Sequence, residues 1–180
     1  MFPVALDLSR VAVLLVGRPG RMLERRKSQL AEVNAKHVTI IESGLPTDEQ
    51  VRSTGVVMAC GLPEAEAKQL SQQAHAMGKL INVEDVVELC DFYFTANVRR
   101  GDLLIAVSTG GASPTLARRV RDYIGRRFGA EWAEHTKEMA QERNALRAKG
   151  AGMKEVLDAS DALLERKGWL SCKGCPKETS

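Results

Sequence analysis

Short apolar runs alternate with amphipathic stretches along the first half of the chain. The runs are continuous, as is typical of strands buried on both faces of a parallel sheet. We expect strands at residues 11–16, 37–41, 55–60 and 80–83. Between strands, apolar residues recur at helical spacing, first at Leu23, Leu30 and Val33, then at Ala67, Leu70, Ala74 and Met77. This alternation predicts a three-layer α/β sheet with right-handed crossovers.

The second half of the chain has a different pattern. Two strand-like runs, 92–98 and 103–109, flank the short polar turn Arg99–Asp102 and predict an antiparallel hairpin. From Pro114 onward the apolar spacing predicts helices that are interrupted at Gly150 and Gly152. We therefore expect three regions: the parallel sheet in residues 1–94, the hairpin and its following helix in residues 95–127, and a C-terminal helical domain in residues 128–180.

The composition limits the possible functions. With 180 residues, of which 44% are hydrophobic, the chain can bury a core as one domain or as one domain with an appendage. A net charge of +3 and an aromatic content of 4% argue against a nucleic-acid partner. Residues 1–8 lack the basic and apolar segments of a secretion signal, and no apolar run approaches the roughly 18 residues of a membrane span. We expect a cytoplasmic protein with no membrane partner.

Cysteine and histidine spacing does not indicate a metal site. Cys60 and Cys90 lie in apolar surroundings and resemble buried thiols of a reducing compartment. Cys172 and Cys175 form one C-x-x-C pair, which is half of a zinc site, in a polar tail that we expect to be frayed. A redox sensor working through this pair is a further interpretation. The histidines have no spacing typical of metal ligands: His37, His75 and His135.

A glycine turn follows the first predicted strand. Gly17, Arg18, Gly20 and Arg21 lie where a Rossmann-like sheet places the pyrophosphate of a dinucleotide. The match to G-x-G-x-x-G is incomplete, because larger residues stand where small ones are usual, and a purely structural turn is the alternative. Glu42, at the end of the second strand, can accept hydrogen bonds from an adenosine ribose. This residue favours NAD over NADP, whereas the two arginines could hold a further phosphate.

A second glycine turn, Ser108–Pro114, joins the last strand-like run to a helix. Ser113 suits the N-cap and Pro114 the first helical position, which leaves free N–H groups at the positive end of a helix dipole. Arginines gather nearby, so an anionic small molecule is the expected ligand. The alternative is a capped turn with solvated arginines and no ligand. The predicted contacts are Ser108, Thr109, Gly110, Gly111, Ser113, Arg99 and Arg118.

Asp85 follows the fourth predicted strand, at the sheet edge where open α/β sheets bind ligands. A carboxylate there can remove a proton. We expect Asp85 to be the general base for a ligand that also touches the turn Ser108–Gly111, if the hairpin folds back over the crevice. The alternative is a turn cap, a common use of aspartate after a strand.

At these residues the chain resembles the precorrin-2 dehydrogenase and sirohydrochlorin ferrochelatase family, whose fold also forms the amino-terminal half of siroheme synthase. The resemblance covers nearly the whole chain and is strongest over residues 82–121, with N-V-x-D, C-D-F-Y-F, R-R-G-D-L and A-V-S-T-G-G-A-S-P-T-L-A-R in that order. Glu24–Lys27 adds to it. The resemblance implies NAD-dependent oxidation of precorrin-2 to sirohydrochlorin, with metal insertion in some members, and a homodimer with residues 95–127 at the subunit contact.

Two matches and two departures follow from this resemblance. Asp85 matches the family's essential aspartate, and Thr109 matches the serine of its substrate turn. Gly17–Arg21 replaces the family's G-G-G-x-V-A, and Cys60–Leu62 replaces T-D-D, both along the nucleotide. The predicted cofactor contacts are Gly17, Arg18, Gly20, Arg21, Glu42, Cys60 and Gly61.

The sequence thus predicts an NAD-dependent precorrin-2 dehydrogenase of siroheme or cobalamin synthesis. The nicotinamide is the expected hydride acceptor, because no amino-acid side chain accepts a hydride. Precorrin-2 and sirohydrochlorin are the expected tetrapyrrole ligands, and a ferrous or cobaltous ion would be a substrate of any chelatase activity. The alternative is a tetrapyrrole-binding protein or chelatase that has lost NAD-dependent chemistry.

Overall fold

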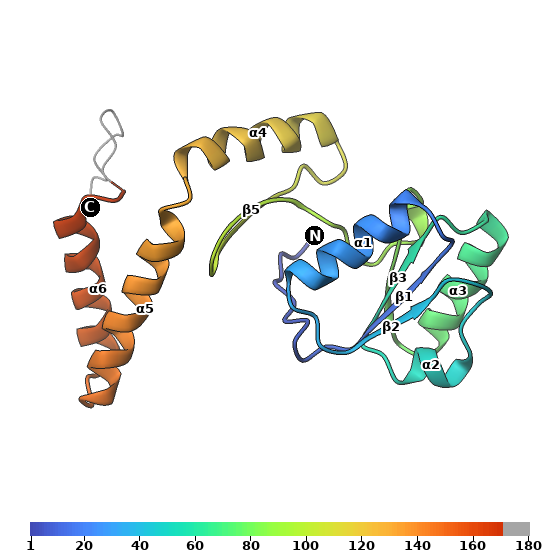
Figure 1. Ribbon diagram of the computed structural model, residues 1–180, viewed down its shortest axis with the longest axis horizontal. Helices are drawn as coiled ribbons and strands as arrows, with labels where there is room; N and C mark the ends of the chain where they lie inside the picture. Colours follow the sequence, from blue (N-terminus) through green and yellow to red (C-terminus); the bar gives the residue numbers. More distant parts are fainter. Residues whose placement is uncertain (171–180) are drawn as a thin grey trace. The chain divides into compact units, whose positions relative to one another are not determined.

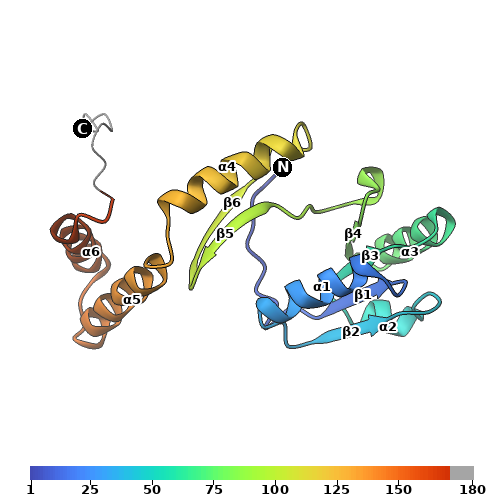
Figure 2. The ribbon, with the colours of Figure 1, turned by 45° about the horizontal axis from the view of Figure 1, so that its top comes forward.

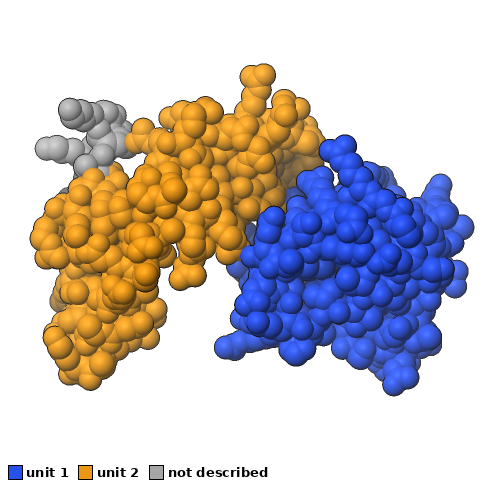
Figure 3. Space-filling model, viewed as in Figure 1, with its two compact units in different colours: residues 1–94 blue, residues 95–180 orange. Residues whose placement is uncertain are grey.

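The computed structural model describes residues 1–170 and divides the chain into two units (Figure 3). Unit 1 is Met1–Phe94, and unit 2 begins at Thr95. The boundary after residue 94 coincides with the first predicted domain boundary. A further boundary after residue 127 stays a prediction. Cys172 and Cys175 lie outside the described residues.

Unit 1 contains the parallel sheet that the apolar runs predicted (Figure 1). Its strands are β1 (Val13–Gly17), β2 (Val38–Ile41), β3 (Val56–Cys60) and β4 (Leu80–Val83), in the order β2-β1-β3-β4. All five residues of β1 and of β3 are buried, because both strands are central and covered on both faces. The α/β class is confirmed.

Helices cover the two faces of this sheet. Helix α1 (Arg21–Glu32) packs Leu23 and Leu30 against one face. Helices α2 (Asp48–Arg52) and α3 (Glu64–Ala76) pack against the other. The apolar spacing did not predict α2, since this five-residue helix buries only Val51 and depends on a capping box between Thr47 and Gln50.

The end of unit 1 differs from the sequence expectation. A short 3-10 helix, η1 (Val87–Leu89), follows β4, and the chain then returns alongside that strand. Asp91 N–H donates to the carbonyl of Ile81 at 2.8 Å, and Asn82 Nδ2 donates to the carbonyl of Phe92 at 2.8 Å. The apolar run that begins at residue 92 therefore covers the open edge of β4 first and becomes a hairpin strand only at residue 96.

Unit 2 begins with a two-stranded antiparallel hairpin, β5 (Ala96–Arg100) and β6 (Leu103–Val107) (Figure 2). The hairpin is confirmed, but its turn has two residues instead of the expected four, because Arg100 pairs with Leu103. Gly101 is the first turn residue and has a φ of +57°. A positive φ at this position is typical of type II′ hairpins, whose twist matches that of the strands.

Helix α4 (Pro114–Arg127) packs on this hairpin, and helices α5 (Trp132–Ala148) and α6 (Met153–Lys167) follow. Val156 and Leu163 of α6 are buried, and Lys167 Nζ lies 2.7 Å from Glu138 Oε1 of α5. The predicted interruption at Gly150 and Gly152 separates α5 from α6. Within residues 1–170, no helix combines the length and the apolar character that a membrane crossing requires.

Candidate functional site

The carboxyl ends of the central strands meet at one edge of the unit 1 sheet. Gly17 ends β1 and pairs with Cys60, which ends β3. A Cβ on Gly17 would lie 2.7 Å from Cys60 Sγ and 2.8 Å from the Cys60 carbonyl oxygen, so only glycine fits there. The predicted cofactor residues Gly17, Cys60 and Gly61 are thus neighbours at this edge.

The start of α1 offers donors for an anion. Gly20 is the N-cap and provides no side-chain hydrogen bond to the helix. The first amides of a helix have no partner within the helix, and the helix dipole makes this end positive. Arg21, the first residue of α1, is exposed. This arrangement can accept the phosphates of a nucleotide.

Two of the predicted cofactor contacts already have partners within unit 1. The Arg18 guanidinium forms an ion pair with Glu66 of α3 and donates to the carbonyl of Gly44 at 3.4 Å. Glu42 follows β2, and its Oε1 lies 2.6 Å from Lys27 Nζ. A nucleotide that used Arg18 or Glu42 would have to exchange or share these partners.

Asp85 is exposed and lies directly after Glu84 at the carboxyl end of β4. Its φ of +66° is one of two positive values among the non-glycine residues described, the other being that of Asn34. Val86 N–H donates to the carbonyl of Val83 at 3.2 Å and closes a turn in which Asp85 is the third residue. A positive φ at the third residue is typical of type II turns, which usually have Gly or Asn there. Asp85 therefore has a strained backbone at the sheet edge where open α/β sheets bind their ligands.

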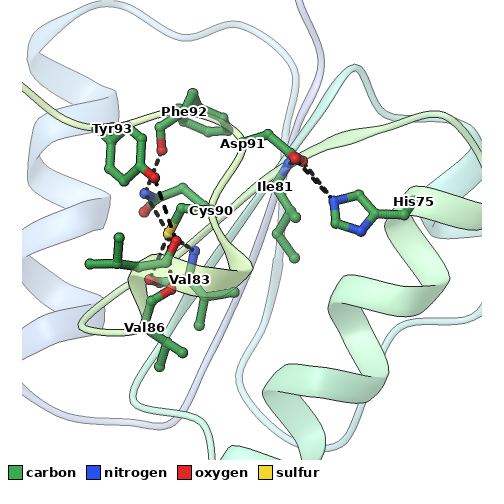
Figure 4. A network of polar contacts seen from close by, with 10 residues as sticks. His75, Ile81, Val83, Val86, Cys90, Asp91, Phe92 and Tyr93 are labelled. Atoms are coloured by element: carbon green, nitrogen blue, oxygen red, sulfur yellow. Dashed lines mark hydrogen bonds and ion pairs between the residues drawn. The ribbon is translucent and has the colours of Figure 1, made fainter. Parts of the chain in front are cut away.

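Cys90 contacts both ends of this turn (Figure 4). Its sulfur lies 3.2 Å from the Val83 nitrogen, 3.1 Å from the Val83 oxygen and 3.2 Å from the Val86 oxygen. Burial raises the pKa of the Cys90 thiol, which therefore stays protonated and can donate. The sequence predicted only a buried small side chain here, because contacts to backbone atoms leave no periodic signal.

Asp91 and His75 complete the network beside β4 (Figure 4). Asp91 Oδ2 accepts from the Ile81 N–H at 2.9 Å and lies 2.9 Å from His75 Nε2 of α3. His75 thus anchors a structural carboxylate. Among the described residues, no group of histidine, cysteine and acidic side chains is arranged to hold a metal ion.

A buried charged pair lies on the α1 side of the same edge. Arg26 of α1 is 8% exposed, and its Nη2 lies 3.6 Å from Glu84 Oε1. The ring of Phe94 covers the guanidinium, with its centroid 3.6 Å from the Arg26 Cζ. Desolvation lowers the pKa of Arg26. In the sequence, Arg26 stands out only as part of the motif Glu24–Lys27. Nothing there pairs it with Glu84, which lies 58 positions away.

The glycine turn of unit 2 has the capped geometry that the sequence predicted. Ser113 is the N-cap of α4, and its Oγ accepts from the Leu116 N–H at 3.1 Å. Thr109 Oγ1 accepts from the Ser113 N–H at 3.1 Å, and Ser108 Oγ accepts from the Gly110 N–H at 3.2 Å. Gly110 and Gly111 have φ values of +62° and +88°. These hydroxyls hold the turn, so a ligand would meet its backbone and the exposed Arg118.

Arg99 lies elsewhere in unit 2. Ala96 pairs with Val107 at one end of the hairpin, next to Ser108, whereas Arg99 pairs with Leu104 close to the opposite turn. There it lines an open groove of about 470 Å³ together with Arg121 and Arg126 of α4. The length of the hairpin therefore separates Arg99 from Ser108 and the glycine turn that the sequence grouped with it as substrate contacts.

Two family models match the sequence. Residues 4–96 match the putative NAD(P)-binding family, and residues 100–127 match the central segment of sirohaem biosynthesis proteins.

Curated relatives with the name siroheme synthase are also similar. The protein of Mannheimia succiniciproducens is 33% identical over 142 residues, which cover 68% of this chain and 29% of the relative. The protein of Xylella fastidiosa is 29% identical over 169 residues, which cover 83% of this chain and 35% of the relative. The chain thus spans about a third of these relatives.

A solved structure named SirC, precorrin-2 dehydrogenase, has a similar fold. The TM-score is 0.73 at 18% sequence identity, and the match covers 95% of this chain and 93% of that chain. The likeness confirms the expected architecture of a Rossmann-like sheet, a hairpin and C-terminal helices.

Proposed function

We propose, from the premise that this chain belongs to the putative NAD(P)-binding family and carries the sirohaem biosynthesis central segment, that it is an NAD-dependent dehydrogenase oxidising precorrin-2 to sirohydrochlorin. The observation that carries the proposal is the exposed carboxylate of Asp85, held on a strained turn at the ligand-binding edge of a dinucleotide-type sheet.

The unit 1 edge fits a dinucleotide. Gly17 packs closely against Cys60 with no room for a side chain of its own, and the uncapped start of α1 suits a pyrophosphate. Gly17, Arg18, Gly20, Arg21, Cys60 and Gly61 would line the nucleotide. The bound nicotinamide supplies the hydride acceptor. Glu42 would accept the ribose hydroxyls and disfavour a phosphate there, so the cofactor is NAD instead of NADP.

Asp85 is the proposed catalytic base. Its side chain is exposed, so it can reach a substrate without rearrangement of the core. It accepts the proton that the substrate loses as it is oxidised. In members that insert a metal ion, the same carboxylate would take the pyrrole N–H protons. A ferrous or cobaltous ion is then a second substrate.

Unit 2 supplies the proposed contacts to the carboxylates of the tetrapyrrole. The turn Ser108–Ser113 presents backbone at the start of α4, where the dipole attracts anions. Arg118 follows one turn later and is exposed. Arg99 contributes from the groove near the hairpin turn. We further propose that the protein is cytoplasmic and forms a homodimer through residues 95–127.

Formation of NADH tests this function. Purified protein is mixed with precorrin-2 and NAD at neutral pH, and the absorbance of NADH is followed. Asp85→Asn should reduce kcat by about a hundredfold or more, since a general base contributes on that order. Glu88→Gln is the matched control, because Glu88 is an exposed acid on the same loop and should keep wild-type activity. A wild-type protein that forms no NADH contradicts the proposal.

The pairs Arg18–Glu66 and Lys27–Glu42 favour one alternative. They occupy two of the predicted nucleotide contacts, as a protein that had lost its cofactor would allow. In that case the chain is a tetrapyrrole-binding protein or a chelatase. A calorimetric titration distinguishes the two: saturable NAD binding supports the dehydrogenase, and sirohydrochlorin binding without NAD binding supports the alternative.

A further inference from the structure

The pair Arg26–Glu84 places two charges in a largely apolar part of unit 1. Neighbouring residues on the α1 side of the sheet, among them Met58 and Cys60, are apolar and fully packed. The Glu84 side chain is 14% exposed, and its Oε2 has no hydrogen-bond partner within residues 1–170. Buried pairs of this kind rarely stabilise a fold more than apolar side chains of the same size would. Arg26 and Glu84 therefore call for another explanation.

Glu84 lies inside the turn that carries Asp85. It is the second residue of the turn Val83–Val86, and its N–H donates to the carbonyl of Ala59 at 2.9 Å, which extends the parallel pairing of β3 and β4 by one residue. Because strand side chains alternate, Val83 points to the α3 side and Glu84 to the α1 side, where Arg26 meets it. Asp85 is the next residue.

Arg26 is itself held rigidly. Its Nη1 donates to Gln29 Oε1 at 2.8 Å, and Phe94 packs on the flat face of its guanidinium. The turn is thus fixed from two sides, by Cys90 at its ends and by Arg26 through the Glu84 side chain. Such support is what a left-handed aspartate requires, since a strained residue persists only where its surroundings hold it.

We propose that Arg26 is a positioning residue, which acts through its ion pair with Glu84 to hold the turn that presents the Asp85 carboxylate. The claim deepens the proposed dehydrogenase function and rests on it. Arg26 contacts neither substrate nor cofactor in this role. Its effect reaches the reaction only through the orientation of Asp85.

The test replaces the pair by apolar residues, in the double variant Arg26→Met/Glu84→Leu. Single neutral variants are avoided, because they leave one buried charge without its partner and destabilise the fold. The double variant should keep a thermal midpoint within about 3 °C of wild type, or above it. It should nevertheless lower kcat by about tenfold to a hundredfold with little change in the KM for NAD, since misplacing a catalytic group affects the chemical step.

Hydrogen exchange gives a readout that does not depend on activity. The Val86 N–H, which closes the turn, should exchange about tenfold faster or more in the double variant. The control is the exposed pair of α3, in the variant Lys68→Met/Glu64→Leu, which should leave kcat and this exchange rate unchanged. Arg26→Lys keeps the charge and should restore part of kcat relative to the double variant.

The outcomes are distinguishable. A double variant with wild-type kcat overturns the proposal, and so does a loss of kcat without faster exchange at Val86. A midpoint that falls by about 10 °C or more, in parallel with activity, makes the pair a determinant of the fold and also overturns it. If the wild-type protein forms no NADH, the dehydrogenase function fails, and exchange alone decides whether Arg26 holds the turn.

Discussion

The two units of this chain differ in how much core each contains. Unit 1 buries every residue of β1 and β3 and has an apolar cluster on each face of its sheet. In the described part of unit 2 the buried apolar residues are only Val98, Ala117, Val156 and Leu163, and α5 buries none. Leu116 and Tyr123, about two helical turns apart on α4, are 53% and 59% exposed. Unit 1 therefore contains most of the buried apolar core, whereas unit 2 leaves large apolar side chains of α4 exposed.

The units differ in their charges as well. Arginines cluster in both, and the sequence assigned both clusters to anionic ligands. In unit 1, Arg18 and Arg26 have ion-pair partners, Glu66 and Glu84. In unit 2, the side chains of Arg99, Arg118 and Arg126 have no ion pair or hydrogen bond among residues 1–170, whereas those of Arg100 and Arg121 have partners. An anion therefore has to compete for Arg18 in unit 1, whereas it finds these three arginines of unit 2 without a partner.

The largest expected effect compares one leucine from each unit. Leu14 is fully buried in unit 1, so Leu14→Ala should lower the free energy of unfolding by about 3 kcal/mol or more. Leu116→Ala should change it by no more than about 0.5 kcal/mol in dilute protein, because the side chain is exposed. Urea denaturation measures both. Equal losses of unfolding free energy in the two variants, at low protein concentration, would contradict the difference in buried core between the units.

Two glycine substitutions should change stability in opposite directions. Gly17→Ala should cost about 1–3 kcal/mol, because its Cβ would meet backbone as well as the Cys60 sulfur. Gly125 lies inside α4, where a Cβ would make only ordinary contacts, at 3.6 Å from Val98 Cγ2. Gly125→Ala should therefore stabilise by about 0.5–1 kcal/mol through helix propensity. Thermal unfolding of both variants checks the signs, and a stabilising Gly17→Ala would contradict the close approach of β1 and β3.

The comparison also shows what the sequence could predict. The strands of unit 1 were predictable because each is a continuous apolar run, and the start of α4 was predictable because Ser113–Pro114 is a local capping signal. The strand β5 was placed too early, since residues 92–94 are apolar for a different reason: Phe92 lies along β4, and Phe94 covers Arg26. Hydrophobicity alone does not distinguish these roles.

The placement of Gly17, Glu42 and Asp85 at strand ends was predictable from the apolar runs that precede them, and their roles stay predictions. The ion pairs around the site were not predictable, because Arg18–Glu66 and Arg26–Glu84 join positions 48 and 58 residues apart. Nor did the sequence indicate that Asp85 has a positive φ, a conformation for which glycine is the usual signal.

Removing a partner of a unit 1 arginine should strengthen nucleotide binding. Glu66→Gln frees Arg18 for the pyrophosphate and should lower the Kd for NAD about twofold to fivefold, as expected for a partly exposed ion pair. Isothermal titration calorimetry measures this change. Glu64→Gln, which removes an exposed carboxylate from the same helix, is the control and should leave the Kd unchanged. Weaker NAD binding in Glu66→Gln would mean that the pair is part of the binding surface.

The smallest expected effect concerns pH and comes from the core of unit 1. Burial raises the pKa of the Cys60 thiol above its usual value of 9.0. The folded state therefore keeps the proton at pH values where the unfolded chain has lost it, so this contribution is full below pH 9.0 and is lost as the pH rises through the higher folded-state pKa. Compared with Cys60→Ala, the wild-type protein should lose more stability between neutral and alkaline pH, as measured by urea denaturation at each pH. Parallel pH profiles would contradict the raised pKa of the Cys60 thiol and hence the effect of its burial.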